Sequence, residues 1–322
     1  MKIRKTLLVG LTLSFLSGCA GMDIGSNIEG YGYLMTENYA GGAERFQEIV
    51  KEKPSSAEAN FYLGRFFMAQ EKVESALPYL QKAARLGPDN ADYQFWLGVA
   101  YGERKMAKKE AAQYEKVLLL NPSYVAAHLY LGHNLLKKGQ VENALASYKQ
   151  VLELAPRNQS ALYNRALIMH ILERSPEEKL AWRIFLRKYP AGPMALRATD
   201  HLNRLEDFSY RNHKLGLRRV TLTKIWFKAF DGKLSKSSYK SLNLIGEIVS
   251  NMPEYTLQVL VYQKNNKLLA QARAESIREY LLENFPQLEG RVNISWFDVD
   301  DTVTAKGKKV AIGESVRFFL TR

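Results

Sequence analysis

The sequence predicts an α-solenoid of helix–turn–helix repeats followed by a small α+β domain. Two observations predict the repeats: prolines recur at a fixed interval, and apolar residues recur in step with them. A third observation predicts a change of fold, because the interval stops after Phe208 and strand-like alternation follows. A fixed period of 34 residues indicates stacked helical units, each of which buries its apolar face against its neighbours.

The repeats are marked by prolines that stand 34 residues apart, at Pro54, Pro88, Pro122, Pro156 and Pro190. Other positions keep the same interval, namely Leu63-Gly64, Leu97-Gly98 and Leu131-Gly132, followed by Leu80, Tyr114 and Tyr148. This pattern resembles the tetratricopeptide repeat (TPR), a helix–turn–helix unit with small residues where its two helices touch. The resemblance covers units 57–90, 91–124, 125–158 and 159–192, and a weaker one at 23–56. We therefore expect a TPR array over 19–208, with a capping helix within 194–208.

The first residues predict export. Three basic residues precede a ten-residue apolar run, 7–16, which is too short to span a bilayer. The run ends in Leu16-Ser17-Gly18-Cys19, which resembles the bacterial lipoprotein box. That resemblance implies a signal peptide at 1–18, lipidation of Cys19 and, through Ala20, an outer-membrane, lipid-anchored location facing the periplasm. A soluble secreted protein with an incidental cysteine, or an uncleaved anchor, is the alternative.

Positive charge gathers in the last third of the chain. The formal net charge is +13, and from residue 209 onward 19 Lys/Arg stand against 11 Asp/Glu. The stretch 211–240 carries nine basic residues opposed only by Asp231. Such a stretch suits anionic lipid headgroups, acidic glycan or an acidic protein, and a solvated basic surface is the alternative. We expect no nucleic-acid partner for an exported lipoprotein, and we expect 209–217 to be a basic linker.

The TPR resemblance also predicts a binding groove. In TPR proteins the first helices of the units line a concave surface that takes peptides or protein segments. The positions that would face it are Phe61, Phe95, Leu129 and Tyr163, with Arg65, Val99, His133 and His170 further along the same helices. This set describes a largely apolar trough with a few polar groups, suited to an extended or helical segment of a protein partner. Ordinary packing between repeats is the alternative.

Residues 218–322 predict a second fold. Period-2 alternation indicates strands at 219–227, 255–262, 292–296 and 316–320. Amphipathic patterns indicate helices at 237–252 and 268–284. The resulting order of strand, helix, strand, helix, strand, strand describes one sheet and two helices.

This order resembles the OmpA-like domain, which grips peptidoglycan. The likeness is sharpest in the run 269–277, where Arg273 matches the arginine that holds the peptide stem in that family. The family's Thr-Asp after the second strand is absent here, and Gln263-Lys264-Asn265-Asn266 stands in its place. Arg273 is thus a possible peptidoglycan contact without its acidic partner. A retained fold with a lost site, or a structural ion pair at Arg273, is the alternative.

No catalytic or cofactor motif is found. The sequence lacks a Gly-rich phosphate loop, a nucleophile-elbow pattern and His-Glu-x-x-His. The five histidines never fall four residues apart, so neither a zinc site nor any other metal site is expected. We therefore expect a protein that is not an enzyme and needs no cofactor.

Together these features predict a non-enzymatic outer-membrane lipoprotein that binds a protein client through its TPR groove. Its architecture resembles lipid-anchored TPR proteins of the TadD and PilF type, which implies a client in a pilus or secretion apparatus. The alternative is an envelope lipoprotein that tethers to peptidoglycan through the OmpA-like domain. A third possibility is a basic domain that binds anionic lipid or lipopolysaccharide.

Overall fold

The computed structural model describes residues 24–305 and 307–322. The chain forms two compact units that divide between Pro156 and Arg157. The expected boundary after residue 208 separates the repeats from the strands, whereas in the structure the fourth full repeat belongs to the same unit as the strands. Within the described residues, no helix combines the length and the apolar character that crossing a membrane requires.

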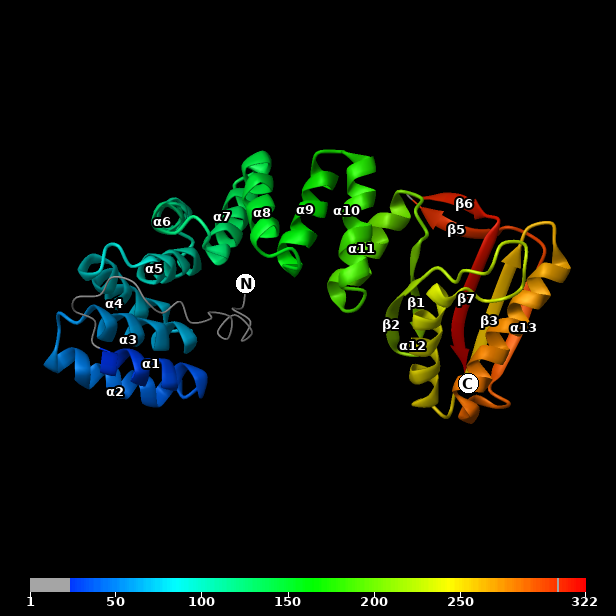
Figure 1. The fold of residues 1–322 in the computed structure, drawn as a ribbon, viewed down its shortest axis with the longest axis horizontal. Coiled ribbons are helices and arrows are strands. Elements are labelled where there is room, and N and C mark those ends of the chain that lie inside the picture. The colour runs from blue at the N-terminus through cyan, green and yellow to red at the C-terminus, as the bar shows by residue number, and fades with distance from the viewer. Residues whose placement is uncertain (1–23, 306) are drawn as a thin grey trace. The chain divides into compact units, whose positions relative to one another are not determined.

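The N-terminal unit consists of antiparallel helix pairs that follow one another along the chain (Figure 1). Its helices are α1 (Ile24–Met35), α2 (Tyr39–Glu52), α3 (Ala57–Ala69), α4 (Val73–Leu86), α5 (Ala91–Glu103), α6 (Ala107–Leu120), α7 (Val125–Lys137) and α8 (Val141–Leu154). Each pair falls within one 34-residue unit of the sequence, including the weaker unit at 23–56. The prediction of a helical repeat array is confirmed.

Close approach between the two helices of a unit explains the repeated glycines. A Cβ on Gly98 would lie 2.7 Å from the Tyr114 ring, and one on Gly64 would lie 2.6 Å from Leu80. Real Cβ atoms do not come so near, so the large side chain of the second helix needs glycine opposite it.

A side-chain hydrogen bond recurs at three of the junctions between repeats. Asn60 donates to the carbonyl oxygen of Pro54 at 3.1 Å, and Gln94 donates to that of Pro88 at 3.0 Å. His128 stands at the next equivalent position, and its Nε2 lies 2.8 Å from the carbonyl oxygen of Pro122. These bonds satisfy backbone acceptors just before the next helix, where no helical N–H reaches them.

The turn between the two helices has the same conformation in every repeat. Glu37, Glu71, Lys105, Gly139 and Glu173 stand 34 residues apart, and all have φ between 52° and 74°. After them the backbone N–H groups of Asn38, Lys72, Met106, Gln140 and Arg174 bond to carbonyls five residues earlier. This is the Schellman ending of a helix, which requires one residue in the left-handed region.

The C-terminal unit begins with α9 (Gln159–Ile171), α10 (Ser175–Lys188) and α11 (Pro193–Arg204). The first two form the fourth full repeat. Helix α11 packs on α10 and buries Ala195, Ala198 and Leu202, so a helix follows the last repeat as expected for 194–208.

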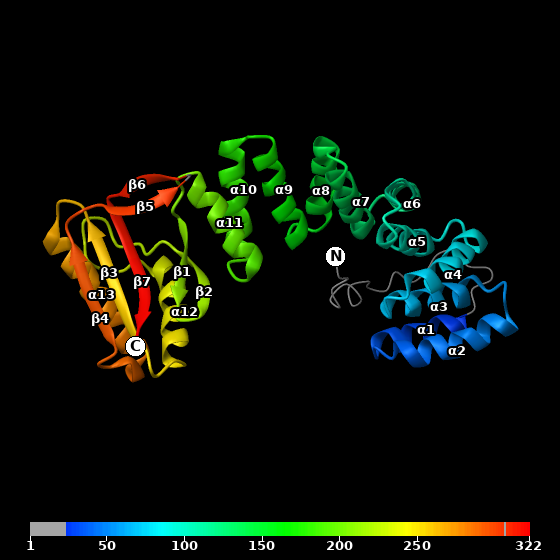
Figure 2. The ribbon, with the colours of Figure 1, turned by 180° about the vertical axis from the view of Figure 1, so that it is seen from behind.

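The rest of this unit is a mixed α+β fold. Its elements are β1 (Tyr210–Leu215), β2 (Arg218–Thr223), α12 (Tyr239–Ser250), β3 (Thr256–Gln263), α13 (Lys267–Asn284), β4 (Val292–Phe297), β5 (Asp301–Ala305), β6 (Lys308–Ile312) and β7 (Glu314–Thr321). Strands β4, β3 and β7 form one sheet in that order, with β3 parallel to β4 and antiparallel to β7. Helices α12 and α13 lie on the same face of this sheet, behind the strands in Figure 2.

The register of the strands aligns apolar side chains on the face of the sheet that packs against α12 and α13. Leu257, Val259 and Val261 of β3 alternate inward and are fully buried or nearly so. Their partners are also apolar: Val292, Ile294 and Trp296 on β4, and Leu320, Phe318 and Val316 on β7. Three apolar rows therefore cross the sheet and face α12 and α13.

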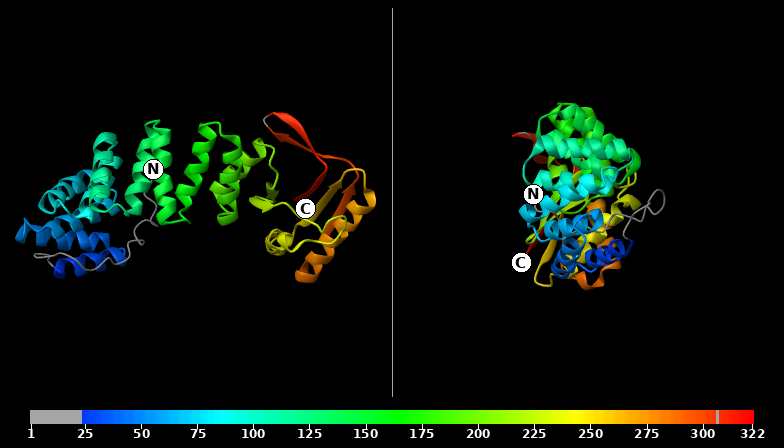
Figure 3. Two further views of the ribbon diagram at one scale, coloured as in Figure 1. Left: turned by 45° about the horizontal axis from the view of Figure 1, so that its top comes forward. Right: turned by 90° about the vertical axis from the view of Figure 1, so that its left-hand side faces the viewer.

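The structure differs from the sequence predictions for this region in three ways. The prediction of a single sheet is wrong, because β1–β2 and β5–β6 form separate two-stranded sheets beside β4–β3–β7. The segment 209–217 is not a linker, because Tyr210–Leu215 pairs with β2 in a hairpin and buries His213 and Leu215. The basic residues of this segment obscured the strand in the sequence, because only His213 and Leu215 are buried. The β5–β6 hairpin was not predicted; Figure 3 shows it as an arm outside the three-stranded sheet.

Candidate functional site

The predicted groove positions of the N-terminal unit differ in exposure. Phe61, Arg65, Phe95 and Val99 are all buried, whereas Leu129 and His133 on α7 are partly exposed. Phe95 packs against aromatic rings of three helices, with Tyr124 at 5.1 Å and Tyr130 at 5.5 Å between centroids. In this unit, α7 therefore offers the accessible part of the predicted set.

Arg65 is a cation held among aromatic rings. Its guanidinium carbon lies 3.6 Å from the centroid of the Trp96 ring and 5.5 Å from that of Phe61. Burial lowers the pKa of Arg65 to about 10, partly opposed by the charge of Asp92. Asp92 in turn accepts a 2.6 Å hydrogen bond from the Tyr124 hydroxyl. The arrangement joins α3 and α5 through a cation–π contact.

The two remaining groove positions lie on α9 in the C-terminal unit. Tyr163 is partly exposed and packs edge-on against Trp182 and Phe185 of α10. The His170 side chain is 45% exposed and points to Glu178 of α10.

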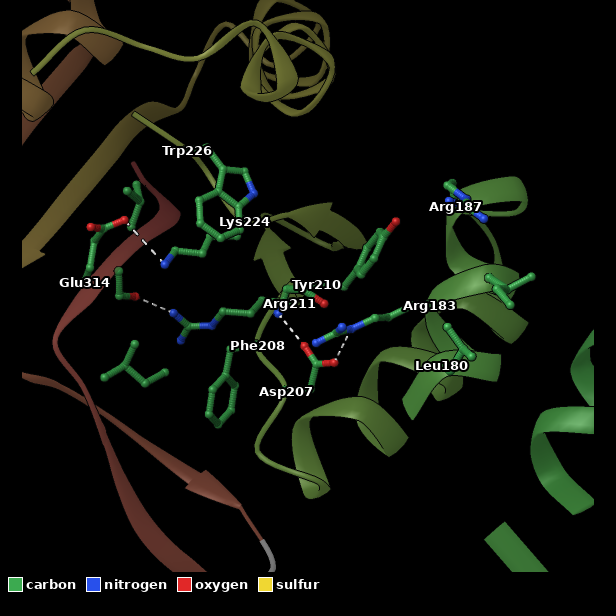
Figure 4. Close-up of a pocket in the computed structure, with 15 residues that line it drawn as sticks. Leu180, Arg183, Arg187, Asp207, Phe208, Tyr210, Arg211, Lys224, Trp226 and Glu314 are labelled. Carbon is green, nitrogen blue, oxygen red and sulfur yellow. Dashed lines mark hydrogen bonds and ion pairs between the residues drawn. The ribbon is translucent and has the colours of Figure 1, made fainter. Parts of the chain in front are cut away.

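A pocket of about 660 Å³ opens in the C-terminal unit between α10, the segment after α11 and the start of β7. Figure 4 shows Arg183 and Arg187 on one side, Lys224 and Trp226 on another, and Arg211 between them. Trp226 is 46% exposed, and the Lys224 Nζ lies 4.5 Å from the centroid of its ring.

Ion pairs offset part of the positive charge of this pocket. Arg183 donates to Asp207 at 2.6 Å, and Lys224 lies 3.4 Å from Glu314. Burial tends to raise the pKa of Asp207, but the hydrogen bonds from Arg183 and Ser209 outweigh it, so this pKa is below its usual value. Four cations against two carboxylates leave the pocket basic, which suits an anionic group beside an aromatic surface.

The wall of the pocket contains a buried charge network. Asp301 is 1% exposed, lies 3.0 Å from Arg211 and also bonds to Arg317 and Ser315. Burial favours the protonated carboxyl, but the bonds from Arg317 and Ser315 and the charge of Arg211 lower the pKa of Asp301 overall. His213 lies beside this network, and burial, reinforced by the charge of Arg211, lowers its pKa to about 4. Arg211, from the basic stretch, is therefore structural.

Arg273, the possible peptidoglycan contact, is 4% exposed. It lies 2.9 Å from Glu314, donates to Gln263 and stacks 4.7 Å from the Phe227 ring centroid. Burial tends to raise the pKa of Glu314. The hydrogen bond from Arg273 opposes this effect, and the net result is a lowered pKa. Arg273 thus has an acidic partner in Glu314, 41 residues further along the chain. The sequence did not reveal this pair, because Glu314 on β7 and Arg273 on α13 come together only in the folded protein.

Another cluster joins residues that sequence reasoning kept apart. His170 of α9, Glu178 of α10 and His201 of α11 place one ligand atom each within 4.8 Å of one another. The expectation of no metal site rested on the spacing of histidines along a single helix, whereas this group comes from three helices. Cys19, the predicted lipidation site, and the predicted signal peptide lie outside the described residues.

Comparisons with known proteins agree with the repeat fold. Models of the tetratricopeptide repeat match residues 29–91, 67–124 and 132–171. No curated protein sequence matches the chain. Among solved structures, PilF of Pseudomonas aeruginosa is similar at 18% identity and a TM-score of 0.52, over 57% of this chain and 85% of that one.

Two further structures resemble the chain. YrrB, described as a TPR protein with an unusual peptide-binding site, is 20% identical over 54% of this chain and 88% of its own, with a TM-score of 0.47. The TPR protein TTC0263 of Thermus thermophilus is 20% identical over 56% of this chain and 98% of its own, with a TM-score of 0.44. These matches and the helical pairs show that residues 29–124 and 132–171 form tetratricopeptide repeats.

Proposed function

We propose that this protein is an outer-membrane lipoprotein that acts as a non-enzymatic scaffold, binding a protein client through its TPR array. The repeat fold carries the proposal, because stacked TPR helices offer extended surfaces for protein segments. The lipoprotein box at Cys19 supports the membrane anchor. The likeness to PilF concerns the fold alone at 18% identity, so a role in a pilus or secretion apparatus rests on the shared architecture of anchor and repeats.

The client surface we favour is the accessible face of α7. Leu129 and His133 are partly exposed there, whereas the equivalent positions on α3 and α5 are buried. An apolar side chain beside a polar one on consecutive turns suits one face of an amphipathic client helix.

Site-specific crosslinking in the native envelope tests this function. A photoreactive residue at Leu129 should give a discrete protein adduct, while one at Gln150, exposed on the partner helix α8, should give none. The two positions share one repeat, so the comparison controls for local folding. Equal labelling at both positions, or adducts at neither, would contradict a client on α7.

The anchor needs a separate test. Cys19→Ser should move the protein from the outer-membrane fraction to the soluble periplasm, because stable anchoring depends on acyl chains. Retention of Cys19→Ser in the membrane fraction would refute the lipid anchor without affecting the proposal about α7.

One observation favours a second candidate, peptidoglycan binding by an OmpA-like domain. The order of β3, α13, β4 and β7, with Arg273 beside Glu314, supplies a cation and a carboxylate at one place. Cell-wall stems carry both an amine and a carboxylate, so this pair has the charges to hold one. Against it, Arg273 is buried and already bound, so a stem would have to displace Glu314 or Gln263.

Sedimentation with purified sacculi tests this candidate. Arg273→Lys should weaken co-sedimentation, since lysine cannot replace a bidentate guanidinium. Arg278→Lys is the matched control, because Arg278 is exposed on the same helix. Absence of wild-type binding, or equal binding by both variants, would rule out this site.

A further inference from the structure

We propose that His170, Glu178 and His201 form a binding site for a divalent transition metal of the zinc class. The site joins α9, α10 and α11 and brings together two imidazoles and one carboxylate. It is independent of the proposed scaffold function and of the C-terminal strands.

The distances fit a metal centre without large rearrangement. The Glu178 Oε1 lies 3.1 Å from the His170 Nδ1 and 3.4 Å from the His201 Nδ1. Zinc binds nitrogen and carboxylate oxygen at about 2.0–2.2 Å, so adjacent ligand atoms of a tetrahedral site lie about 3.3 Å apart. These two separations lie on either side of that value, and all three ligand atoms lie within 4.8 Å of one another.

Hydrogen bonding alone leaves this cluster incompletely satisfied. The Glu178 Oε1 already accepts a 3.1 Å hydrogen bond from the Trp182 Nε1. The His201 Nδ1 is buried, lies 3.4 Å from the same oxygen and makes no hydrogen bond of good geometry. A metal ion would use this nitrogen's lone pair, which the carboxylate cannot do.

The surroundings hold the ligands in place and leave a path for the ion. Trp182 bonds to the Glu178 carboxylate and stacks on the His201 ring, with centroids 4.8 Å apart. Such outer contacts orient metal ligands. Glu178 and His201 are largely buried, but the His170 side chain is 45% exposed, so the cluster is open on one side. Three protein ligands with one open position are a known zinc arrangement.

Metal binding to the full chain, without a histidine tag and after chelator treatment, tests the proposal. Titration with Zn²⁺ should show one site, and Co²⁺ should give the visible absorption of a tetrahedral centre. His170→Asn and Glu178→Gln should each weaken Zn²⁺ binding at least about tenfold. His128→Asn is the control, because it also removes a histidine, while Asn60 makes the same junction bond at the equivalent position.

Zinc should also raise the thermal midpoint of the wild type and not that of His170→Asn, because a ligand that binds only the folded state stabilises it. If Glu178→Gln fails to fold, the half-exposed His170→Asn still decides the matter. The proposal is overturned if wild-type protein binds no Zn²⁺, or if His170→Asn binds it as tightly as wild type. In either case the cluster is a His–Glu ion pair only.

Discussion

The guanidinium of Arg211 lies 3.0 Å from the carboxylate of Asp301, although 90 residues separate them in the chain. The contact joins β1 to β5, and Asp301 is almost completely buried. Removing the charge of Asp301 would leave Arg211 and Arg317 without their shared partner, and breaking a buried ion pair in this way is costly.

Asp301→Asn should therefore reduce the free energy of unfolding by about 2–4 kcal/mol. Urea unfolding followed by tryptophan fluorescence measures this, since Trp182, Trp226 and Trp296 all lie in the C-terminal unit. Asp298→Asn changes an exposed aspartate in the same acidic run and should have little effect. Equal stability of the two variants would mean that the network contributes little.

Acidification should destabilise the C-terminal unit through His213. Its pKa is about 4 in the folded protein and about 6.5 when unfolded. The unfolded chain therefore binds a proton first, and stability falls as the pH drops from 6.5 to 4, by about 3 kcal/mol in total. His213→Gln should flatten the curve in this range, measured by urea unfolding at several pH values. The Asp301 carboxyl titrates below this window, because its pKa is lowered. An unchanged slope in His213→Gln would contradict the assignment.

Two glycine substitutions should have opposite effects. Gly98→Ala places a Cβ 2.7 Å from the Tyr114 ring and should cost about 1–3 kcal/mol through overpacking. Gly32→Ala, inside α1 with nothing within 4 Å of the new Cβ, should stabilise by up to about 1 kcal/mol through helix propensity. Far-ultraviolet circular dichroism during thermal unfolding compares them. Stabilisation by both would show that the repeat helices can move apart freely.

The stability that the junction hydrogen bonds provide should require a side-chain donor, and more than one residue type should be able to supply it. Gln94 donates to both the Pro88 and Ala84 carbonyls, so Gln94→Ala leaves two acceptors without their donor and should cost about 1–3 kcal/mol. Gln94→Asn should lose less, because Asn60 makes the bond to the proline carbonyl at the equivalent position, although its second acceptor is Ser56 at the start of its own helix. Chemical denaturation ranks the variants, and equal losses would assign the effect to packing rather than to the bond.

The repeat array was predictable because its period depends on local features. Proline, glycine and aromatic residues recur in register, and each helix pair contacts mainly its chain neighbours. The helices and four strands of the last third, β2, β3, β4 and β7, were also predictable from periodicity. The β5–β6 hairpin was missed, and β1 was interpreted as a linker because its charged residues are neutralised by partners far along the chain, as Arg211 is by Asp301.

Site features were harder to predict for the same reason. Glu314 meets Arg273, and His170 meets His201, only after distant segments fold together. Residue spacing along a single helix cannot predict contacts between side chains on different elements. The lipidation of Cys19 and the outer-membrane location are sequence predictions that remain to be tested by fractionation.

The left-handed turns inside the repeats have a practical consequence. Four of the five use glutamate or lysine where backbone sterics favour glycine, and only residue 139 is a glycine. Each such residue carries a strain of about 1 kcal/mol, part of which glycine would relieve. Effects at independent sites add, so the gains at the turns of separate repeats should add. Replacing these turn residues by glycine, one repeat at a time, should therefore give a more stable protein and leave the surfaces of the helices unchanged.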